Sequence, residues 1–340
     1  MKTFRTLSCF MLCGMLMVQY ASSQAFRNAG SSGMQFLKIG VGARAMGMGG
    51  AFSSTIGDAA ALAWNPAGIG TISNIALSVQ HTPWIAGVDH NFAGIVLPVT
   101  PEFNLGLHVI NLSSGNIDIT TIDDPLGTGE QYTVSDVAVG LTSSVRLTSQ
   151  LTFATTVKYI QETIYDLVSG GVAIDAGMSY ATGYRSLHVG FAISNLGFEQ
   201  HFTGRQLEVR YVPSAASEPP VKAELQSAQF TLPLQFRASG AFDLLTMFDE
   251  PSPQHSIRCA VEFIQHSDIR EQLVLGAEYQ WEQALSLRSG YIVNSDELSW
   301  SSGLGYAFAL SGVECSLDYA VNDLGRFGLG QRFGVSFMFY

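Results

Sequence analysis

The chain carries few of the side-chain arrangements that catalysis or metal binding requires. Its histidines occur singly, without the H-x-x-x-H spacing that places two metal ligands on one helix face, and no G-x-S-x-G nucleophile turn is present. The seven histidines are His81, His90, His108, His188, His201, His255 and His266. The sequence therefore predicts no enzyme, no bound cofactor and no metal centre.

Acidic side chains occur among arginines in the second half of the chain. This mixture favours ion pairing over an acid–base set, because paired charges tolerate burial. The acids are Asp175, Glu262, Glu278, Glu314 and Asp318, and the arginines are Arg237, Arg258 and Arg288. Three more acids, Asp118, Asp123 and Asp124, lie in a predicted loop, where a solvated acidic surface is the commoner alternative to a calcium site.

Apolar residues recur at every second position from residue 73 onward, which is the period of a β-strand. Several segments run nine residues or more, near the length of about 9–11 that crosses a bilayer at a tilt and longer than the strands of most soluble sheets. The fourteen segments lie at 75–79, 90–99, 103–109, 137–147, 151–159, 172–180, 187–193, 230–242, 257–263, 273–281, 285–293, 298–310, 313–321 and 333–339. The predicted fold is all-β, a transmembrane antiparallel β-barrel of about fourteen strands.

The two faces of these segments differ in charge. The apolar faces carry no Lys, Arg, Asp or Glu, whereas the opposite faces carry the acids and arginines described above. Tyr and Trp near the segment ends, such as Tyr159 and Trp281, fit the aromatic girdles at the two membrane surfaces. We therefore expect the apolar face to contact outer-membrane lipid and the charged face to line the lumen.

The links between segments alternate in length. Residues 100–102, 148–150 and 310–312 are short, whereas residues 113–131 and 196–228 form long links on the other side. Short periplasmic turns and longer external loops are typical of outer-membrane barrels, and an even strand count then places both termini in the periplasm. Residues 243–254 depart from this rule, because the link lies on the short side but is not short.

The first 23 residues are predicted to be a cleaved signal peptide. Lys2 and Arg5 precede an apolar core at residues 10–18, and small residues end at Ser23. Cleavage leaves Cys259 and Cys315, which either form a disulfide or lie on lipid-facing strand surfaces. A net charge of −11 excludes the basic surface that a nucleic-acid partner needs.

Residues 24–72 break the strand pattern and are predicted to form a plug, followed by the barrel at 73–340. Residues 40–52 read GVGARAMGMGGAF, and residues 57–68 read GDAAALAWNPAG. Asp58 can cap a helix that continues through the alanines and ends near Trp64 because of Pro66, so we expect a glycine-rich loop, a two-turn helix and a proline turn. The partial dinucleotide fingerprint at Gly40–Ala45 lacks the βαβ unit that nucleotide binding requires.

Arg44 is the single charged residue between Lys38 and Asp58. If the plug buries it, it needs a carboxylate partner, since an unpaired buried charge is costly. The candidates are the predicted luminal acids Glu278, Glu314 and Asp318; the alternative is that Arg44 reaches periplasmic water and pairs with nothing. We expect Arg44 and Asp58, with the turn Trp64-Asn65-Pro66-Ala67, to hold the barrel closed.

These N-terminal motifs resemble the PorV/PorQ family of outer-membrane proteins. The similarity covers Gln35-Phe36-Leu37, the run from Gly42 to Phe52 and Trp64-Asn65-Pro66-Ala67-Gly68. Shorter C-terminal matches are Leu275-Gly276-Ala277-Glu278-Tyr279, Arg288-Ser289-Gly290-Tyr291 and Leu317-Asp318-Tyr319-Ala320. The resemblance extends over essentially the whole mature chain and places it within the wider group of FadL-like fourteen-stranded barrels, whose Asn-Pro-Ala motif lies in an N-terminal hatch.

The resemblance implies a role in type IX secretion in the outer membrane of a Gram-negative bacterium of the Bacteroidota or a related lineage. In that role the barrel binds secretion-system proteins or secreted cargo and passes cargo to the cell surface. Members of the broader FadL-like group instead let hydrophobic small molecules cross the membrane. That channel function is the alternative expectation.

Overall fold

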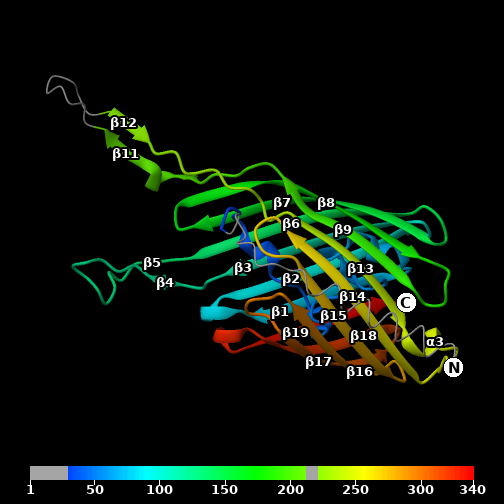
Figure 1. The fold of residues 1–340 in the computed structure, drawn as a ribbon. Helices are drawn as coiled ribbons and strands as arrows, with labels where there is room; N and C mark the ends of the chain where they lie inside the picture. The colour runs from blue at the N-terminus through cyan, green and yellow to red at the C-terminus, as the bar shows by residue number, and fades with distance from the viewer. Residues whose placement is uncertain (1–29, 212–220) are drawn as a thin grey trace.

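The computed structural model describes residues 30–211 and 221–340, so the expected signal peptide at residues 1–23 lies outside the described residues. Fifteen strands form one sheet, of which β10 (Thr203–Gly204) is a short addition beside β8; the other fourteen close into an antiparallel barrel (Figure 1). They are β1 (Ile75–Pro83), β2 (Asp89–Thr100), β3 (Phe103–Ser113), β6 (Val134–Arg146), β7 (Leu151–Ile164), β8 (Leu167–Ala181), β9 (His188–Gly197), β13 (Gln235–Asp243), β14 (His255–His266), β15 (Gln272–Trp281), β16 (Leu285–Val293), β17 (Trp300–Leu310), β18 (Val313–Asp323) and β19 (Leu329–Phe339). The predicted fold and strand number are confirmed.

The first and last strands pair with each other and close the ring. Leu77 of β1 lies opposite Phe337 of β19, and both flank further antiparallel neighbours, so the fourteen strands leave no open edge in the barrel. Within each strand side chains alternate between the two faces: Leu275 is exposed on the outside, whereas Val274 beside it is fully buried. The outward side chains are therefore largely apolar, as the sequence pattern predicts, whereas the inner face carries the buried charges Glu278 and Arg288 together with apolar residues such as Val274.

The two ends of the barrel differ in their connections. At one end, here called the loop end, the link after β3 carries the ribbon β4 (Ile117–Asp118) and β5 (Gln131–Tyr132). The link after β9 carries β10, η6 (Arg205–Leu207), β11 (Glu208–Tyr211) and β12 (Val221–Glu224), and both extensions project beyond the barrel in Figure 1. The other end, here called the turn end, contains the C-terminus and mostly tight turns.

One link at the turn end is longer because it folds into a helix. Residues 244–254 contain α3 (Leu244–Met247), which Asp243 caps by accepting a hydrogen bond from the backbone of Thr246 at 2.8 Å. The long link at residues 243–254, which departs from the pattern of short turns at this end, therefore contains a short helix.

The eighth predicted segment begins too early. β13 starts at Gln235, whereas Phe230 pairs with Gln200 in an isolated bridge and Leu232 is buried inside the barrel. Pro233 explains the difference, because it has no backbone N–H to give to the ladder. Phe230 and Leu232 therefore pack against the plug and not against lipid.

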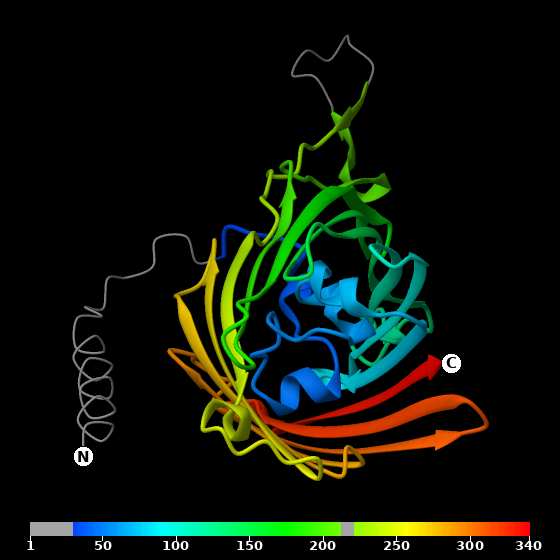
Figure 2. The same cartoon turned by 90° about the vertical axis from the view of Figure 1, so that its right-hand side faces the viewer.

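The described residues before β1, from residue 30 onward, lie inside the ring of strands, which Figure 2 shows from the turn end. They contain four short helices, η2 (Gln35–Lys38), α2 (Ala43–Gly47), η3 (Ala59–Ala63) and η4 (Pro66–Thr71). Their apolar side chains, including Phe36, Leu62 and Ile69, form one buried cluster with Phe92 and Val96 of the wall. No helix in the described part of the chain is long and apolar enough to span a membrane.

The predicted short helix after Asp58 is present, and it is a 3₁₀ helix. Residues 59–63 form the 3₁₀ helix η3, with Trp64 N–H donating to Ala61 at 2.9 Å. Pro66 prevents continuation, so the segment is too short for α-helical bonds to propagate. The glycine-rich segment before it, expected as a loop, contains the α-helical turn α2.

Cys259 and Cys315 lie on β14 and β18, which three strands separate, and both are free. Cys315 is buried between Phe308 and Phe337, its partners on the adjacent strands. The disulfide alternative is therefore wrong.

Candidate functional site

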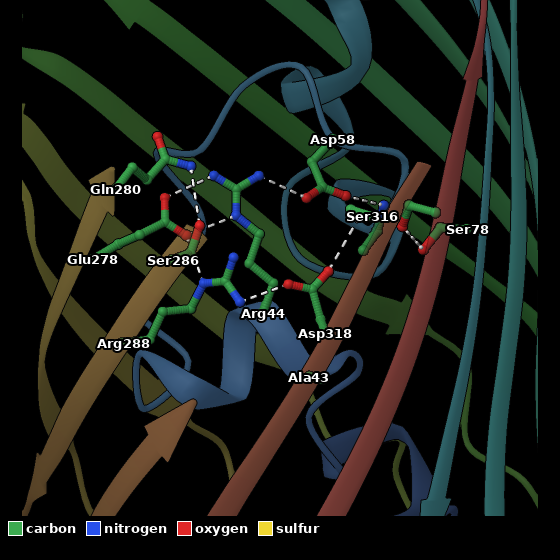
Figure 3. A network of polar contacts seen from close by, with 12 residues as sticks. Ala43, Arg44, Asp58, Ser78, Glu278, Gln280, Ser286, Arg288, Ser316 and Asp318 are labelled. Atoms are coloured by element: carbon green, nitrogen blue, oxygen red, sulfur yellow. Dashed lines mark hydrogen bonds and ion pairs between the residues drawn. The ribbon is translucent and has the colours of Figure 1, made fainter. Parts of the chain in front are cut away.

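Arg44 connects the plug to the barrel wall. It extends from α2 toward β15, where its Nε and Nη2 donate to the two carboxylate oxygens of Glu278 at 3.0 and 2.9 Å. Its Nη1 donates to Asp58 at 3.0 Å, so one guanidinium also links α2 to the start of η3 (Figure 3). Glu278 is 1% exposed, and such bidentate charged pairs are geometrically specific.

The Glu278 carboxylate has a second cationic partner in the wall. Arg288 of β16 donates from Nε to Glu278 at 2.6 Å and from Nη1 to Asp318 of β18 at 2.6 Å. Figure 3 shows the resulting chain of alternating charges from Asp58 through Arg44, Glu278 and Arg288 to Asp318. Asp318 therefore belongs to the network but contacts Arg288 and not Arg44.

Glu314, the third candidate partner of Arg44, is exposed and accepts a hydrogen bond from the Tyr340 hydroxyl at 2.6 Å. This hydrogen bond raises the pKa of the Tyr340 phenol. Glu314 precedes Asp318 by four residues on β18, which moves it about 13 Å along the strand toward the turn end. Glu314 is thus not a partner of Arg44, although it contributes to the same cavity.

A second contact between plug and wall was not singled out from the sequence. Glu262 of β14 is fully buried and accepts the backbone N–H groups of Phe52 and Ser53 at 2.9 and 2.8 Å and the Ser53 hydroxyl at 2.8 Å. Arg237 of β13 donates to the same carboxylate at 2.6 Å. The alternation of the strand predicts only that Glu262 faces the lumen. It does not predict that the carboxylate accepts backbone N–H groups of the plug.

The Trp-Asn-Pro-Ala turn on which the resemblance partly rests is also held by the wall. Trp64 donates from its indole to Val41 at 2.9 Å, and Arg237 lies over its ring at 4.6 Å from the centroid. Asn65 is fully buried and donates to the carbonyls of Ser53 and of Met178 on β8, at 2.7 and 3.0 Å. Its side-chain oxygen accepts from Ala67 at 3.1 Å and so caps η4, which begins at Pro66.

Glycines in the wall allow the plug to approach closely. A Cβ at Gly290 of β16 would collide with the backbone of Met48 and Gly49. A Cβ at Gly177 of β8 would collide with Asn65 and Pro66. These positions fix where the plug can dock.

The N-terminal part of the plug is pinned near the loop end. Lys38 donates to Asp268, in the link between β14 and β15, at 2.8 Å, and Gln35 donates to the same carboxylate at 3.0 Å. Burial by itself would raise the pKa of Asp268, but the hydrogen bonds and charge of Lys38 and the Gln35 hydrogen bond hold the pKa below its ordinary value. Arg332 of β19 donates to the carbonyl of Gly40.

Two cavities lie at opposite ends of the plug and share no lining residue. The inner cavity, at the turn end, has a volume of about 390 Å³ and includes Arg44, Asp58, Arg288 and Asp318. The outer cavity, at the loop end, has a volume of about 460 Å³ and lies between residues 33–40 and the wall. The charged network around Arg44 therefore forms one wall of the inner cavity.

The acidic loop carries no cation site in the described residues. Across residues 30–211 and 221–340, no group of three His, Cys, Asp or Glu side chains is placed to hold a metal ion. Asp118 instead accepts a hydrogen bond from Gln131 at 2.8 Å across the β4–β5 ribbon.

The fold resembles that of several solved structures. The toluene transporter TbuX of Ralstonia pickettii superposes with a TM-score of 0.55 at 12% identity, covering 88% of this chain and 99% of that one. A FadL homologue of Pseudomonas aeruginosa gives a TM-score of 0.53 at 12% identity, with coverages of 87% and 97%. The monoaromatic hydrocarbon channel CymD gives 0.54 at 14% identity, with coverages of 89% and 98%.

No protein-family model and no curated protein sequence matches the chain. The likeness to the solved structures shows the shared fold, which is the FadL-type fourteen-stranded outer-membrane barrel.

Proposed function

We propose that this chain is a plugged channel of the outer membrane that lets small hydrophobic molecules cross. The observation that carries the proposal is the arrangement of plug and cavities: the plug, held by Arg44 and Glu278, lies between an outer and an inner cavity. The toluene transporter and the hydrocarbon channel that share the fold support this reading. The apolar outer face of the strands would contact membrane lipid.

In this proposal the plug is the gate. The ion pairs and backbone contacts of the plug would keep the lumen closed to ions, and movement of the plug would join the two cavities. The chain's own residues supply binding and gating only, and no chemical step is required.

The test is uptake of labelled toluene into vesicles whose outer leaflet is lipopolysaccharide, since apolar solutes cross phospholipid bilayers without help. Vesicles containing the protein should take up toluene faster than protein-free vesicles. Equal rates, with the barrel shown to be folded by its heat-dependent mobility on gels, would contradict the channel function.

A second candidate function, binding of secreted proteins in type IX secretion, is favoured by the loop-end extensions. These extensions expose large apolar side chains, with Ile122 and Leu126 at 100% and 99% exposure and Phe198 at 87%. If these side chains form a contiguous apolar patch, it would be of the kind that marks protein-binding surfaces. The N-terminal resemblance to the PorV/PorQ family supports the same reading.

Copurification separates the two candidates. If the extensions bind a secretion partner, the parent protein should bring down secretion components from its native membrane, and the pair Ile122→Ser and Leu126→Ser should reduce that yield. Toluene uptake without copurification of secretion components would support the channel function and contradict the secretion role.

A further inference from the structure

The outer cavity is a partly apolar pocket open toward the loop end. Its walls include Phe36 and Ile39 of the plug, Trp84 and Leu298 of two loop-end links, and Leu112 of β3. Its volume of about 460 Å³ lies within the range of small-molecule sites, about 300–1,000 Å³.

Two carboxylates on neighbouring strands line this pocket. Asp136 of β6 is the register partner of Glu162 of β7, and directly cross-strand side chains have Cβ atoms about 4.5–5.5 Å apart. Asp136 is 6% exposed, and its Oδ1 has no hydrogen-bond partner among the described residues. Glu162 is half-buried and lines the pocket together with Met34.

The cations that also line the pocket are committed to other groups. Lys38 pairs with Asp268 at 2.8 Å. Arg332 donates to Asn322 at 2.8 Å and to the carbonyl of Gly40. No ion pair joins either pocket acid to a Lys or Arg of the part of the chain that is described, so neither the buried Asp136 nor the half-buried Glu162 has a direct cationic partner.

We propose that the outer cavity binds small amphiphilic amines, with the ammonium group between Asp136 and Glu162 and the apolar body against Phe36, Trp84 and Leu112. An ammonium offers three N–H donors and one positive charge, which the unpartnered Oδ1 of Asp136 and the carboxylate of Glu162 can share. The inference deepens the proposed channel function, on which it rests, by naming the solutes that the outer pocket prefers.

The same geometry disfavours two other ligands. A carboxylate head placed between Asp136 and Glu162 would face two like charges, and juxtaposed like charges are destabilising. A divalent metal needs about six oxygen ligands or waters, whereas this pocket offers two carboxylates beside aromatic and aliphatic walls.

Calorimetry on the purified full chain in a non-ionic detergent tests the proposal with three probes. 2-Phenylethylammonium carries both features, phenylacetate replaces the ammonium by a carboxylate, and methylammonium lacks the ring. We expect 2-phenylethylammonium to bind at least tenfold more tightly than either of the others. Equal affinity for phenylacetate or for methylammonium would overturn the proposal.

Variants locate the site. Asp136→Asn and Glu162→Gln should each weaken 2-phenylethylammonium binding at least tenfold, whereas Glu102→Gln, an exposed carboxyl at the turn end, should leave it unchanged. Asp136→Asn removes an unpaired buried acid, so it should fold, and Glu162→Gln provides an independent second test. Unchanged binding in both folded pocket variants would overturn the proposal.

Toluene uptake by the same preparations separates this inference from the channel function. Toluene uptake without preferential binding of 2-phenylethylammonium would contradict the amine site and support the channel function. Amine binding that depends on Asp136, without uptake of toluene or of the amine, would support the site and contradict the channel.

Discussion

Arg44 and Glu278 lie 234 positions apart in the sequence and meet inside the barrel through two hydrogen bonds of 3.0 and 2.9 Å. The pair joins the N-terminal plug to β15, and Glu278 keeps Arg288 as a partner if Arg44 is removed. The plug can therefore lose this contact without leaving the Glu278 carboxylate unpaired. The contact of Arg44 with the wall can therefore be tested by mutation without leaving a buried charge unpaired.

The double change Arg44→Ala with Asn65→Ala should loosen the plug and raise conductance in planar bilayers several-fold. Arg44 supplies the ion pairs to Glu278 and Asp58, and Asn65 supplies the bond to Met178 of β8. The barrel ladder does not involve either side chain, so folding should persist. Deletion of residues 40–70 should open the lumen further.

The matched control is Arg326→Ala, which removes an exposed ion pair with Glu297. Exposed pairs contribute little, about 0–1 kcal/mol. A folded double variant that conducts no more than the Arg326 control would show that the plug does not close the barrel.

Gly290→Ala should destabilise docking of the plug. The added Cβ would collide with the backbone of Met48 and Gly49, and overpacking of this kind costs about 1–3 kcal/mol. We expect a lower midpoint in denaturant and a higher open fraction in bilayers. Gly240→Ala is the control, because its Cβ would have one contact at 3.9 Å, with the carbonyl of His188; equal midpoints for the two variants would refute the close approach.

Leu317→Arg should reduce folding stability in lipid by about 2–4 kcal/mol, because it places a charge on the outward face near mid-strand. Ser316→Arg is the adjacent control on β18, where the side chain lines the inner cavity. Refolding into lipid vesicles measures both, and equal stabilities would mean that the faces of β18 are misassigned.

Surface labelling tests which end of the barrel is external. In a background without Cys259 and Cys315, Ile122→Cys in the β4–β5 extension should react with an impermeant maleimide on intact cells. Ser149→Cys lies in the exposed turn between β6 and β7 at the turn end. It should react only after the outer membrane is permeabilised. Labelling of the Ser149 site on intact cells would reverse the orientation.

The Lys38–Asp268 contact predicts a pH dependence at the loop end. The pKa of Asp268 is below its ordinary value, so the pair stabilises the plug above the ordinary carboxyl pKa of about 3.9 and loses that contribution only as pH falls through the lowered pKa. Amide exchange of residues 35–40, corrected for its intrinsic rate, should therefore stay constant from about pH 7 to pH 5.

Asp268→Asn should raise exchange in residues 35–40 over that whole range, since the ionised partner of Lys38 is gone. The control Asp296→Asn changes an exposed carboxyl in the nearby link between β16 and β17. Similar exchange in the Asp268 and Asp296 variants would mean that the ion pair does not hold the plug.

The sequence by itself determined the barrel and the faces of its strands. Alternation of apolar and polar residues is a local property, because the pleat turns successive side chains to opposite faces whichever strand lies alongside. Leu275 and Glu278 could therefore be assigned to outside and inside without knowing their neighbours. Local chemistry also predicted Asp58 as a cap, which the structure places on Ala60 at 2.9 Å.

Only the tertiary structure decided which luminal groups meet the plug. Period two gives Glu262, Glu278 and Glu314 the same inward direction, but not their height along the lumen or the path of the plug beside them. The register of β14 to β18 brings Glu278 to Arg44 and places Glu314 near Tyr340. Several of these contacts are with plug backbone: Glu262 accepts from the N–H groups of Phe52 and Ser53, and Gly290 lies against the backbone of Met48 and Gly49. Side-chain patterns do not encode such contacts, because every non-proline residue offers the same backbone N–H and C=O groups.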